Sequence, residues 1–233
     1  MSYSQFTFKT VKKQFDLTEI NTPLFTEVIE IPISNWLKTT LAMTEKMPLK
    51  SEKARSEGIV APLLFELKQC NLNKITLFSG EELDVDSQKG LNGECDFILT
   101  QNPQSTTVDT PIFCLVEAKQ NIIEKNLGQC VAQMLGAREL NKIEEHSIET
   151  IFGAVTTGEI WRFLKLEENI IYTDTRKYFI ENPNQILGVF KYFFLQPLDN
   201  EQREFNTELA LRYCLKHPQW RLSLQTHKWL GIA

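Results

Sequence analysis

Residues 94–119 read ECDFILTQNPQSTTVDTPIFCLVEAK, and they contain two strand signals joined by a polar loop. The first run, residues 94–100, directly follows Asn92 and Gly93, a pair typical of turns. The second run, residues 111–119, has five apolar residues in succession, which favours a strand that is buried on both faces. These residues therefore predict two core strands of a sheet.

Acidic side chains and a lysine occur at the ends of these strands. Glu117 and Lys119 are two positions apart, so they point to the same face of the strand, with Ala118 on the other. If the two strands pair, Asp96 can approach Glu117. Glu52, in the first turn of a helix that Ser51 can cap, could approach from above.

The elements on either side predict an α/β domain with a mixed sheet flanked by helices. The core order is helix, three strands, helix and strand. Pro62 predicts a kink in the first of these helices. The expected helices are 36–43, the helix from residue 51 to about 67, 126–142 and 184–194; the expected strands are 24–33, 74–79, 81–85, 94–100, 111–119, 151–156, 159–166 and 170–173.

Three carboxylates brought together would repel one another. At about 4 Å and an effective dielectric constant near 20, each pair costs roughly 4 kcal/mol. A divalent cation removes that repulsion, and Mg²⁺ suits carboxylate, water and phosphate oxygens. The expected metal ligands are Asp96, Glu117 and Glu52, the expected ion is Mg²⁺ with Mn²⁺ as an alternative, and Lys119 would hold or polarise a metal-bound water.

The segments GECDFIL and IFCLVEAK resemble the two core strands of the PD-(D/E)XK (restriction-endonuclease-like) nuclease superfamily. SEKARSEGIVAPLLFEL resembles the helix before that core, and NLGQCVAQMLGA the helix after it. Residues 51–166 also look like a family of uncharacterised cyanobacterial proteins, with ITLFSG and IFGAVTTGEIWRFL as further points of likeness. Cys95 stands where the superfamily name has proline.

This resemblance implies a restriction-endonuclease-like fold and Mg²⁺-dependent hydrolysis of phosphodiesters. The implied catalytic residues are Lys119, Glu117, Asp96, Glu52 and Gln129. Glu57 is the alternative to Glu52, and Gln133 is the alternative to Gln129 as the glutamine beside the site. Taken singly, a Glu-x-Lys sequence is more often a strand end that meets solvent, and an acidic residue in a first helical turn needs no further role.

The C-terminal residues 195–233 resemble a different family. LQPLDNEQREFNTELALRYCLKHPQWRLSLQTHKWLGIA looks like the end of 7-carboxy-7-deazaguanine synthase, a radical S-adenosylmethionine enzyme of the queuosine pathway. The Cys-x-x-x-Cys-x-x-Cys sequence that would hold its iron–sulfur cluster is absent from these residues. We therefore expect two parts, a nuclease-like domain over residues 1–194 and a C-terminal extension over residues 195–233. A plain amphipathic helix followed by a strand is the alternative for this extension.

Composition is that of an ordinary folded protein. The 233 residues are 42% hydrophobic and 24% charged, with a net charge of −5, which argues against non-specific binding to nucleic acid as the main role. The five cysteines form no Cys-x-x-Cys pair and are expected to be reduced, with Cys95, Cys114 and Cys130 in apolar stretches. The N-terminus has no secretory signal, so a cytoplasmic location is expected.

The sequence thus favours a metal-dependent nuclease acting on nucleic acid, with DNA as the expected partner and a homodimer as a possible assembly. One alternative is a non-catalytic nucleic-acid-binding module with the same fold. Another, which depends on residues 195–233 alone, is a role in deazapurine biosynthesis.

Overall fold

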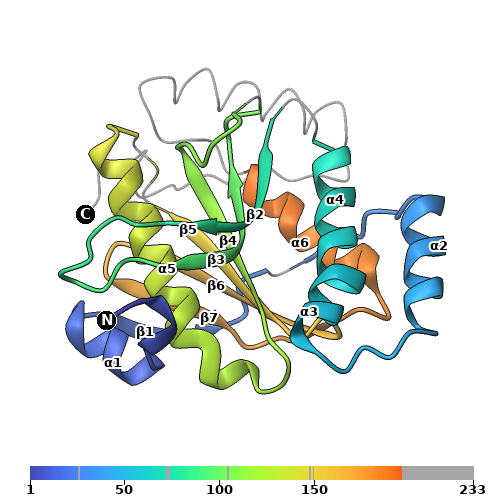
Figure 1. Ribbon diagram of the computed structural model, residues 1–233, viewed down its shortest axis with the longest axis horizontal. Coiled ribbons are helices and arrows are strands. Elements are labelled where there is room, and N and C mark those ends of the chain that lie inside the picture. Colours follow the sequence, from blue (N-terminus) through green and yellow to red (C-terminus); the bar gives the residue numbers. More distant parts are fainter. Residues whose placement is uncertain (26, 72–73, 104, 147, 149, 196–233) are drawn as a thin grey trace.

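The computed structural model describes residues 1–25, 27–71, 74–103, 105–146, 148 and 150–195. Its centre is a mixed eight-stranded sheet with helices on both faces (Figure 1), which confirms the predicted α/β class. The strands are β1 (Thr18–Thr22), β2 (Thr76–Glu82), β3 (Glu94–Thr100), β4 (Ile112–Ala118), β5 (Ile151–Thr156), β6 (Ile160–Glu167), β7 (Ile170–Asp174) and β8 (Tyr178–Phe179). The helical elements are η1 (Tyr3–Gln5), α1 (Phe8–Gln14), α2 (Asn35–Thr44), α3 (Glu52–Arg55), η2 (Ser56–Val60), α4 (Ala61–Gln69), α5 (Ile123–Ile143) and α6 (Pro183–Leu195).

The strand order in the sheet is β1-β7-β6-β5-β4-β3-β2, with β8 paired to β6. Two neighbouring pairs, β1 with β7 and β4 with β5, are parallel, and the other pairs are antiparallel. The parallel pair β4–β5 is joined through α5, the crossover helix that such a connection requires. This crossover packs α5 against β4, the strand that carries Glu117 and that Lys119 directly follows.

Side-chain alternation along the strands divides the interior into two cores. On β3, Ile98 packs in the core under α5, whereas Phe97 and Leu99 pack in the core under α4 and α6. On β6, Leu164 packs in the core under α5, and Phe163 packs in the core under α4 and α6. Burial on both faces explains why these strands are almost continuously apolar.

The predicted strand at residues 24–33 is wrong. This segment runs along α6 instead, where the Ile31 amide donates to the Asn184 carbonyl at 3.0 Å and the Ile33 amide donates to Asn184 Oδ1 at 3.2 Å. Gly188 allows the close approach, because a Cβ there would lie 2.3 Å from the Ile29 carbonyl oxygen. The edge strand β1 is formed by earlier residues, whose mixed composition carries a weak strand signal.

The two short strands predicted on either side of Gly80 are one strand, β2. Gly80 has a φ of +67°, which glycine adopts without strain, so the strand bends there and does not end. The predicted helix from residue 51 begins as expected, since Ser51 Oγ accepts from the Ala54 amide at 3.1 Å. Its irregular part is η2, a π-helical turn just before Pro62, which is where the proline predicted a break in regularity.

Cys95, Cys114 and Cys130 are buried free thiols, as predicted, whereas Cys214 lies outside the described residues. The predicted boundary between residues 194 and 195 stays a prediction, because α6 extends to Leu195 and residues 196–233 are also outside the described part. Among the described helices, none combines the length and the apolar character needed to cross a membrane. The cytoplasmic location stays a prediction.

Candidate active site

The strands β3 and β4 separate at the point where the acidic residues begin. Their last paired residues at this end are Phe97 and Val116. Beyond this pair, the Ala118 amide donates to the side chain of Asp96 and not to a backbone carbonyl of β3. The hydrogen bond to Asp96 Oδ2 is 2.7 Å long. This bond fixes Asp96 against the end of β4, as the predicted pairing of the two strands required.

Glu117 lies in the interior of the site, with only 1% of its surface exposed. Two glutamines of α5 donate to its carboxylate: Gln129 Nε2 to Oε1, and Gln133 Nε2 to Oε2 at 2.7 Å. These glutamines are four residues apart, so they lie one helical turn apart on the same side of α5. Both candidate glutamines therefore contact the site, where the sequence left them as alternatives.

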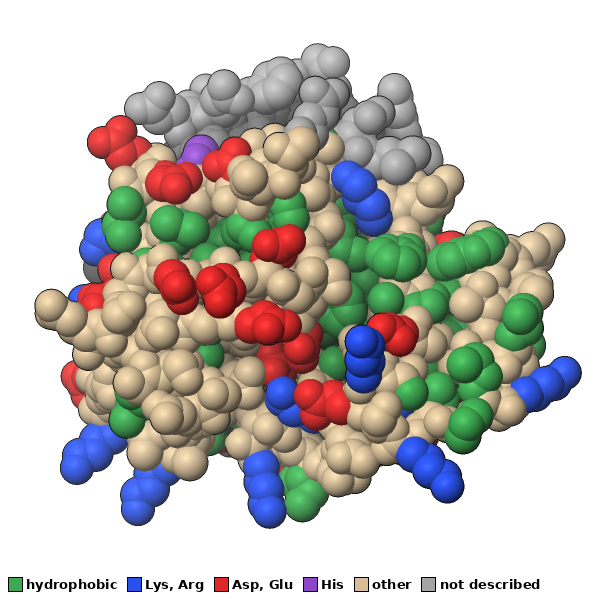
Figure 2. Space-filling view, in the orientation of Figure 1, with side chains coloured by type: hydrophobic (Ala, Val, Ile, Leu, Met, Phe, Trp, Pro, Cys, Tyr) green, Lys and Arg blue, Asp and Glu red, His purple; other side chains and the backbone are tan. Residues whose placement is uncertain are grey.

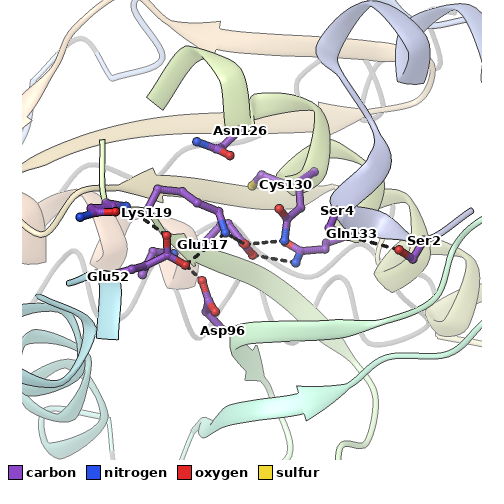
Figure 3. Close-up of polar contacts among 12 residues, drawn as sticks. Ser2, Ser4, Glu52, Asp96, Glu117, Lys119, Asn126, Cys130 and Gln133 are labelled. Carbon is purple, nitrogen blue, oxygen red and sulfur yellow. Dashed lines mark hydrogen bonds and ion pairs between the residues drawn. The ribbon is translucent and has the colours of Figure 1, made fainter. Parts of the chain in front are cut away.

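Lys119 joins the buried and the exposed parts of the site. Its Nζ atom lies 2.6 Å from Glu117 Oε1 and 3.6 Å from Glu52 Oε1. Its backbone amide donates to the Thr156 carbonyl at 2.7 Å, which holds the residue beside β5. Figure 3 shows Glu52, Asp96 and Lys119 gathered around Glu117.

Glu52 reaches the site from the start of α3. Its Oε2 atom accepts from the Gln120 amide at 3.1 Å, while the Gln120 side chain donates to the Lys50 carbonyl at 2.7 Å. Gln120 thus ties the helix start to the end of β4. Sequence reasoning did not single it out, although its position directly after Glu-x-Lys was the available signal.

The electrostatics of the site follow from burial and from the closeness of like charges. Burial raises the pKa of Glu117, the Asp96 charge raises it further, and Lys119 and Gln133 oppose the rise, so that this pKa reaches about 7. Burial also raises the pKa of Asp96, against the opposing effects of Lys119 and the Ala118 amide. Burial alone would lower the pKa of Lys119, but the charges of Glu117, Asp96 and Glu52 outweigh it and raise that pKa.

The five predicted catalytic residues, Lys119, Glu117, Asp96, Glu52 and Gln129, are therefore together in space. Glu57, the alternative to Glu52, is not among them: it is largely exposed and lies 3.8 Å from Lys53. Their catalytic roles stay predictions, because the contacts seen here also hold the strand end and the two helices in place.

Asp96 and Glu117 offer carboxylate oxygens, which are the ligands that hard divalent cations prefer. One or two carboxylates and several waters can hold such a cation. Asp96 Oδ1 has no hydrogen-bond partner among the described residues and could act as a ligand. In the part of the chain that the structure describes, however, no group of three or more acidic, histidine or cysteine side chains is arranged to hold a metal ion. Glu117 already accepts from Gln129 and Gln133 and pairs with Lys119, and Glu52 Oε2 accepts from the Gln120 amide. Metal binding by Asp96, Glu117 and Glu52 stays a prediction.

Comparisons with known proteins concern only a short segment of the chain. A stretch of 43 residues is 63% identical to 7-carboxy-7-deazaguanine synthase of Caulobacter vibrioides, and the same figures hold for the enzyme of Bordetella pertussis. The enzyme of Prochlorococcus marinus is 56% identical over 41 residues. Each match covers 18% of this chain, and the chain spans about a fifth of the length of the first two relatives. No family model matches the chain, and no solved structure matches it significantly.

These comparisons correct the functional prediction. The matched proteins bear the name of a deazapurine-forming enzyme, and none is named as a nuclease, a hydrolase or a DNA-binding protein. The predicted nuclease function is therefore wrong, and the findings favour the alternative that depended on residues 195–233. The resemblance to 7-carboxy-7-deazaguanine synthase is confirmed, whereas the comparisons do not support the resemblance to PD-(D/E)XK nucleases. The α/β class is confirmed without its restriction-endonuclease-like detail.

Proposed function

We propose that this chain takes part in deazapurine biosynthesis by binding a 7-deazaguanine compound. The observation that carries the proposal is the 63% identity over 43 residues with 7-carboxy-7-deazaguanine synthases. Identity at this level over a continuous stretch supports a shared ligand or partner for that stretch. Because these 233 residues lack the closely spaced cysteines needed for an iron–sulfur cluster, binding and not radical chemistry is the proposed role.

The test is calorimetric titration of the full chain with 7-carboxy-7-deazaguanine, with guanine as the comparison compound. We expect saturable binding of the first compound and at least about tenfold weaker binding of guanine, a difference of about 1.4 kcal/mol. Trp220→Ala changes the stretch HPQWRLSLQTHK that carries the resemblance, and it should weaken binding. Trp36→Ala, a matched control on the exposed surface of α2, should not. Absence of binding by the unaltered chain would refute the proposal.

We also propose that Asp96 and Glu117 hold a divalent cation, with Mg²⁺ as the expected ion and Mn²⁺ as a substitute. The support is that the charge of the half-buried Asp96 raises the pKa of the buried Glu117, and that Asp96 Oδ1 has no hydrogen-bond partner among the described residues. A bound cation would offset their repulsion and could receive an anionic group, such as the carboxylate that the name 7-carboxy-7-deazaguanine denotes. Lys119 would keep Glu117 ionised and oriented, and Gln129 would fix its carboxylate.

This cation site is tested by titrating Mg²⁺ into the protein while the thermal midpoint is recorded. Binding to the native state alone stabilises it, by about 2.7 kcal/mol when the ion is at 100 times its dissociation constant. Asp96→Asn should remove this stabilisation, and the control Glu45→Gln at the end of α2 should retain it. If Mg²⁺ has the same effect on Asp96→Asn as on the unaltered protein, Asp96 is not a ligand. A nucleic-acid partner and a homodimer stay predictions.

A further inference from the structure

The strand β1 forms one edge of the sheet, and its outer side has no backbone partner. Its parallel ladder with β7 uses alternate residues: the Thr18 amide donates to the carbonyl just before β7 at 2.9 Å, and the Thr22 carbonyl accepts from the amide just after β7 at 3.3 Å. The backbone N–H and C=O groups of Glu19 and Asn21 therefore point away from β7. Among the described residues, no hydrogen bond reaches these outward groups.

The opposite edge of the sheet, β2, is protected against pairing, whereas β1 is not. Gly80 bends β2 with its φ of +67°, and Glu81 and Glu82 follow as exposed charges. Figure 2 shows acidic side chains gathered over β2 and β3. Bends and charges of this kind prevent a sheet edge from pairing with another chain. Within β1 there is no glycine, proline or lysine, and its one charge, on Glu19, is paired with Lys12 of α1.

The five residues of β1 are close to symmetric about their centre. They read Thr, Glu, Ile, Asn and Thr, with Ile20 in the middle and a threonine at each end. In an antiparallel pair of two copies centred on Ile20, each threonine faces a threonine, and Glu19 faces Asn21 of the partner subunit. The outward backbone groups then meet as two hydrogen-bonded pairs, in which opposed residues exchange both of their N–H···O bonds. This pairing satisfies all of the outward groups and places no like charges directly opposite each other.

The side chains of β1 suit this pairing on both faces of the sheet. On the face that carries α1, Asn21 Nδ2 donates to Glu19 Oε1 of its own chain at 2.9 Å. An amide carries two N–H donors, so the second can reach Glu19 of the partner subunit, whose ionised carboxylate only accepts. On the other face, Ile20 is 39% exposed and lies beside Tyr172 in the register with β7. At the centre of the pair, Ile20 contacts its own copy, which removes apolar surface from water.

We propose that a second copy of this chain pairs with β1 in antiparallel register about a two-fold axis at Ile20, so that two eight-stranded sheets become one continuous sheet. Two five-residue strands bury less than the roughly 1,600 Å² of a standard stable interface, so the dimer is reversible and depends on protein concentration. In the strand order, β4 lies four strands away from β1. The dimer therefore leaves the candidate active site open, and the proposal is independent of the ligand and the cation proposed above.

Sedimentation equilibrium of the full chain over a wide range of concentration tests the proposal. The average mass should rise from the 27.0 kDa of one chain toward twice that value. Asn21→Pro removes an outward N–H and leaves the ladder with β7 intact, and Ile20→Lys places like charges opposite each other at the axis. Each should weaken association at least about tenfold. The control Ile143→Lys, the same change at an exposed isoleucine at the end of α5, should associate like the unaltered chain.

A cross-link tests the register and does not depend on how well these variants fold. Opposed residues of a non-hydrogen-bonded antiparallel pair have Cα atoms about 4.5 Å apart, which is within the range of a disulfide. With Cys70 and Cys214 both replaced by serine, Ile20→Cys should form a covalent dimer when oxidised glutathione is added, and the control Ile143→Cys should not.

The outcomes decide which occupant the edge of β1 takes. A reversible dimer that both edge variants weaken, together with the cross-link at position 20, supports the proposal. A chain that stays monomeric and does not cross-link refutes it, and leaves the edge of β1 to an extended segment of another protein. A dimer that both edge variants retain also refutes it, because the two copies then meet elsewhere.

Discussion

Replacement of Glu117 by glutamine should remove most of the pH dependence of stability between pH 4.5 and 7. In the folded protein the pKa of Glu117 rises from 4.5 to about 7, chiefly through burial. The folded state therefore holds a proton in this range that the unfolded state releases. The stability that this group contributes is greatest below pH 4.5 and falls until the pH passes 7. At about 1.4 kcal/mol per pH unit, the loss due to this group is about 3 kcal/mol.

Urea denaturation of the full chain at several pH values between 4.5 and 8, followed by circular dichroism, measures this loss. The test is the change in stability across the range and not its absolute value, because an amide at position 117 faces the donors Gln129 and Gln133 and lowers stability at every pH. Asp96→Asn should reduce the fall, since the Asp96 charge contributes to the raised pKa of Glu117. The exposed control Glu181→Gln should leave it unchanged. If Glu117→Gln loses as much stability as the unaltered protein between pH 4.5 and 7, burial of the Glu117 carboxylate is not the cause of the fall in stability.

Three further substitutions test how the elements around the site are held. Asn141→Ala should cost about 2–4 kcal/mol in urea denaturation, because its buried amide accepts from the Ile112 amide at 2.8 Å and donates to the Ile112 carbonyl at 2.7 Å, and both groups would lose their partner; a cost below about 1 kcal/mol would contradict this. Gly128→Ala should destabilise the protein by more than about 2 kcal/mol and release α1 to proteases, because the new Cβ would lie 2.2 Å from the backbone carbon of Thr7; unchanged proteolysis would show that α1 shifts easily. Ser34→Ala should cost about 2–4 kcal/mol, because Ser34 Oγ accepts from the Leu37 amide at 3.2 Å as the α2 cap and donates to the buried Glu66 carboxylate at 2.8 Å; a cost below about 1 kcal/mol, or restoration by Val as well as by Thr, would contradict a role of the hydroxyl.

The sequence by itself determined the two central strands, the crossover helix and the side on which Glu117 and Lys119 lie. The physical reason is that apolar periodicity and the alternation of side chains along a strand depend on residues close together in the sequence and not on tertiary contacts. It was also sufficient to reveal the resemblance to 7-carboxy-7-deazaguanine synthase, because that likeness lies in the order of residues along one short stretch of 43 residues.

The tertiary structure decided which acidic residue of the first helix reaches the site. Glu52 and Glu57 both precede the core, and only the docking of α3 on Gln120 separates them. It also decided that residues 24–33 run along α6, since their hydrogen bonds go to Asn184, more than 150 residues away. It also decided that both Gln129 and Gln133 donate to Glu117, because this depends on how the crossover helix α5 packs on β4, and no local pattern records that packing.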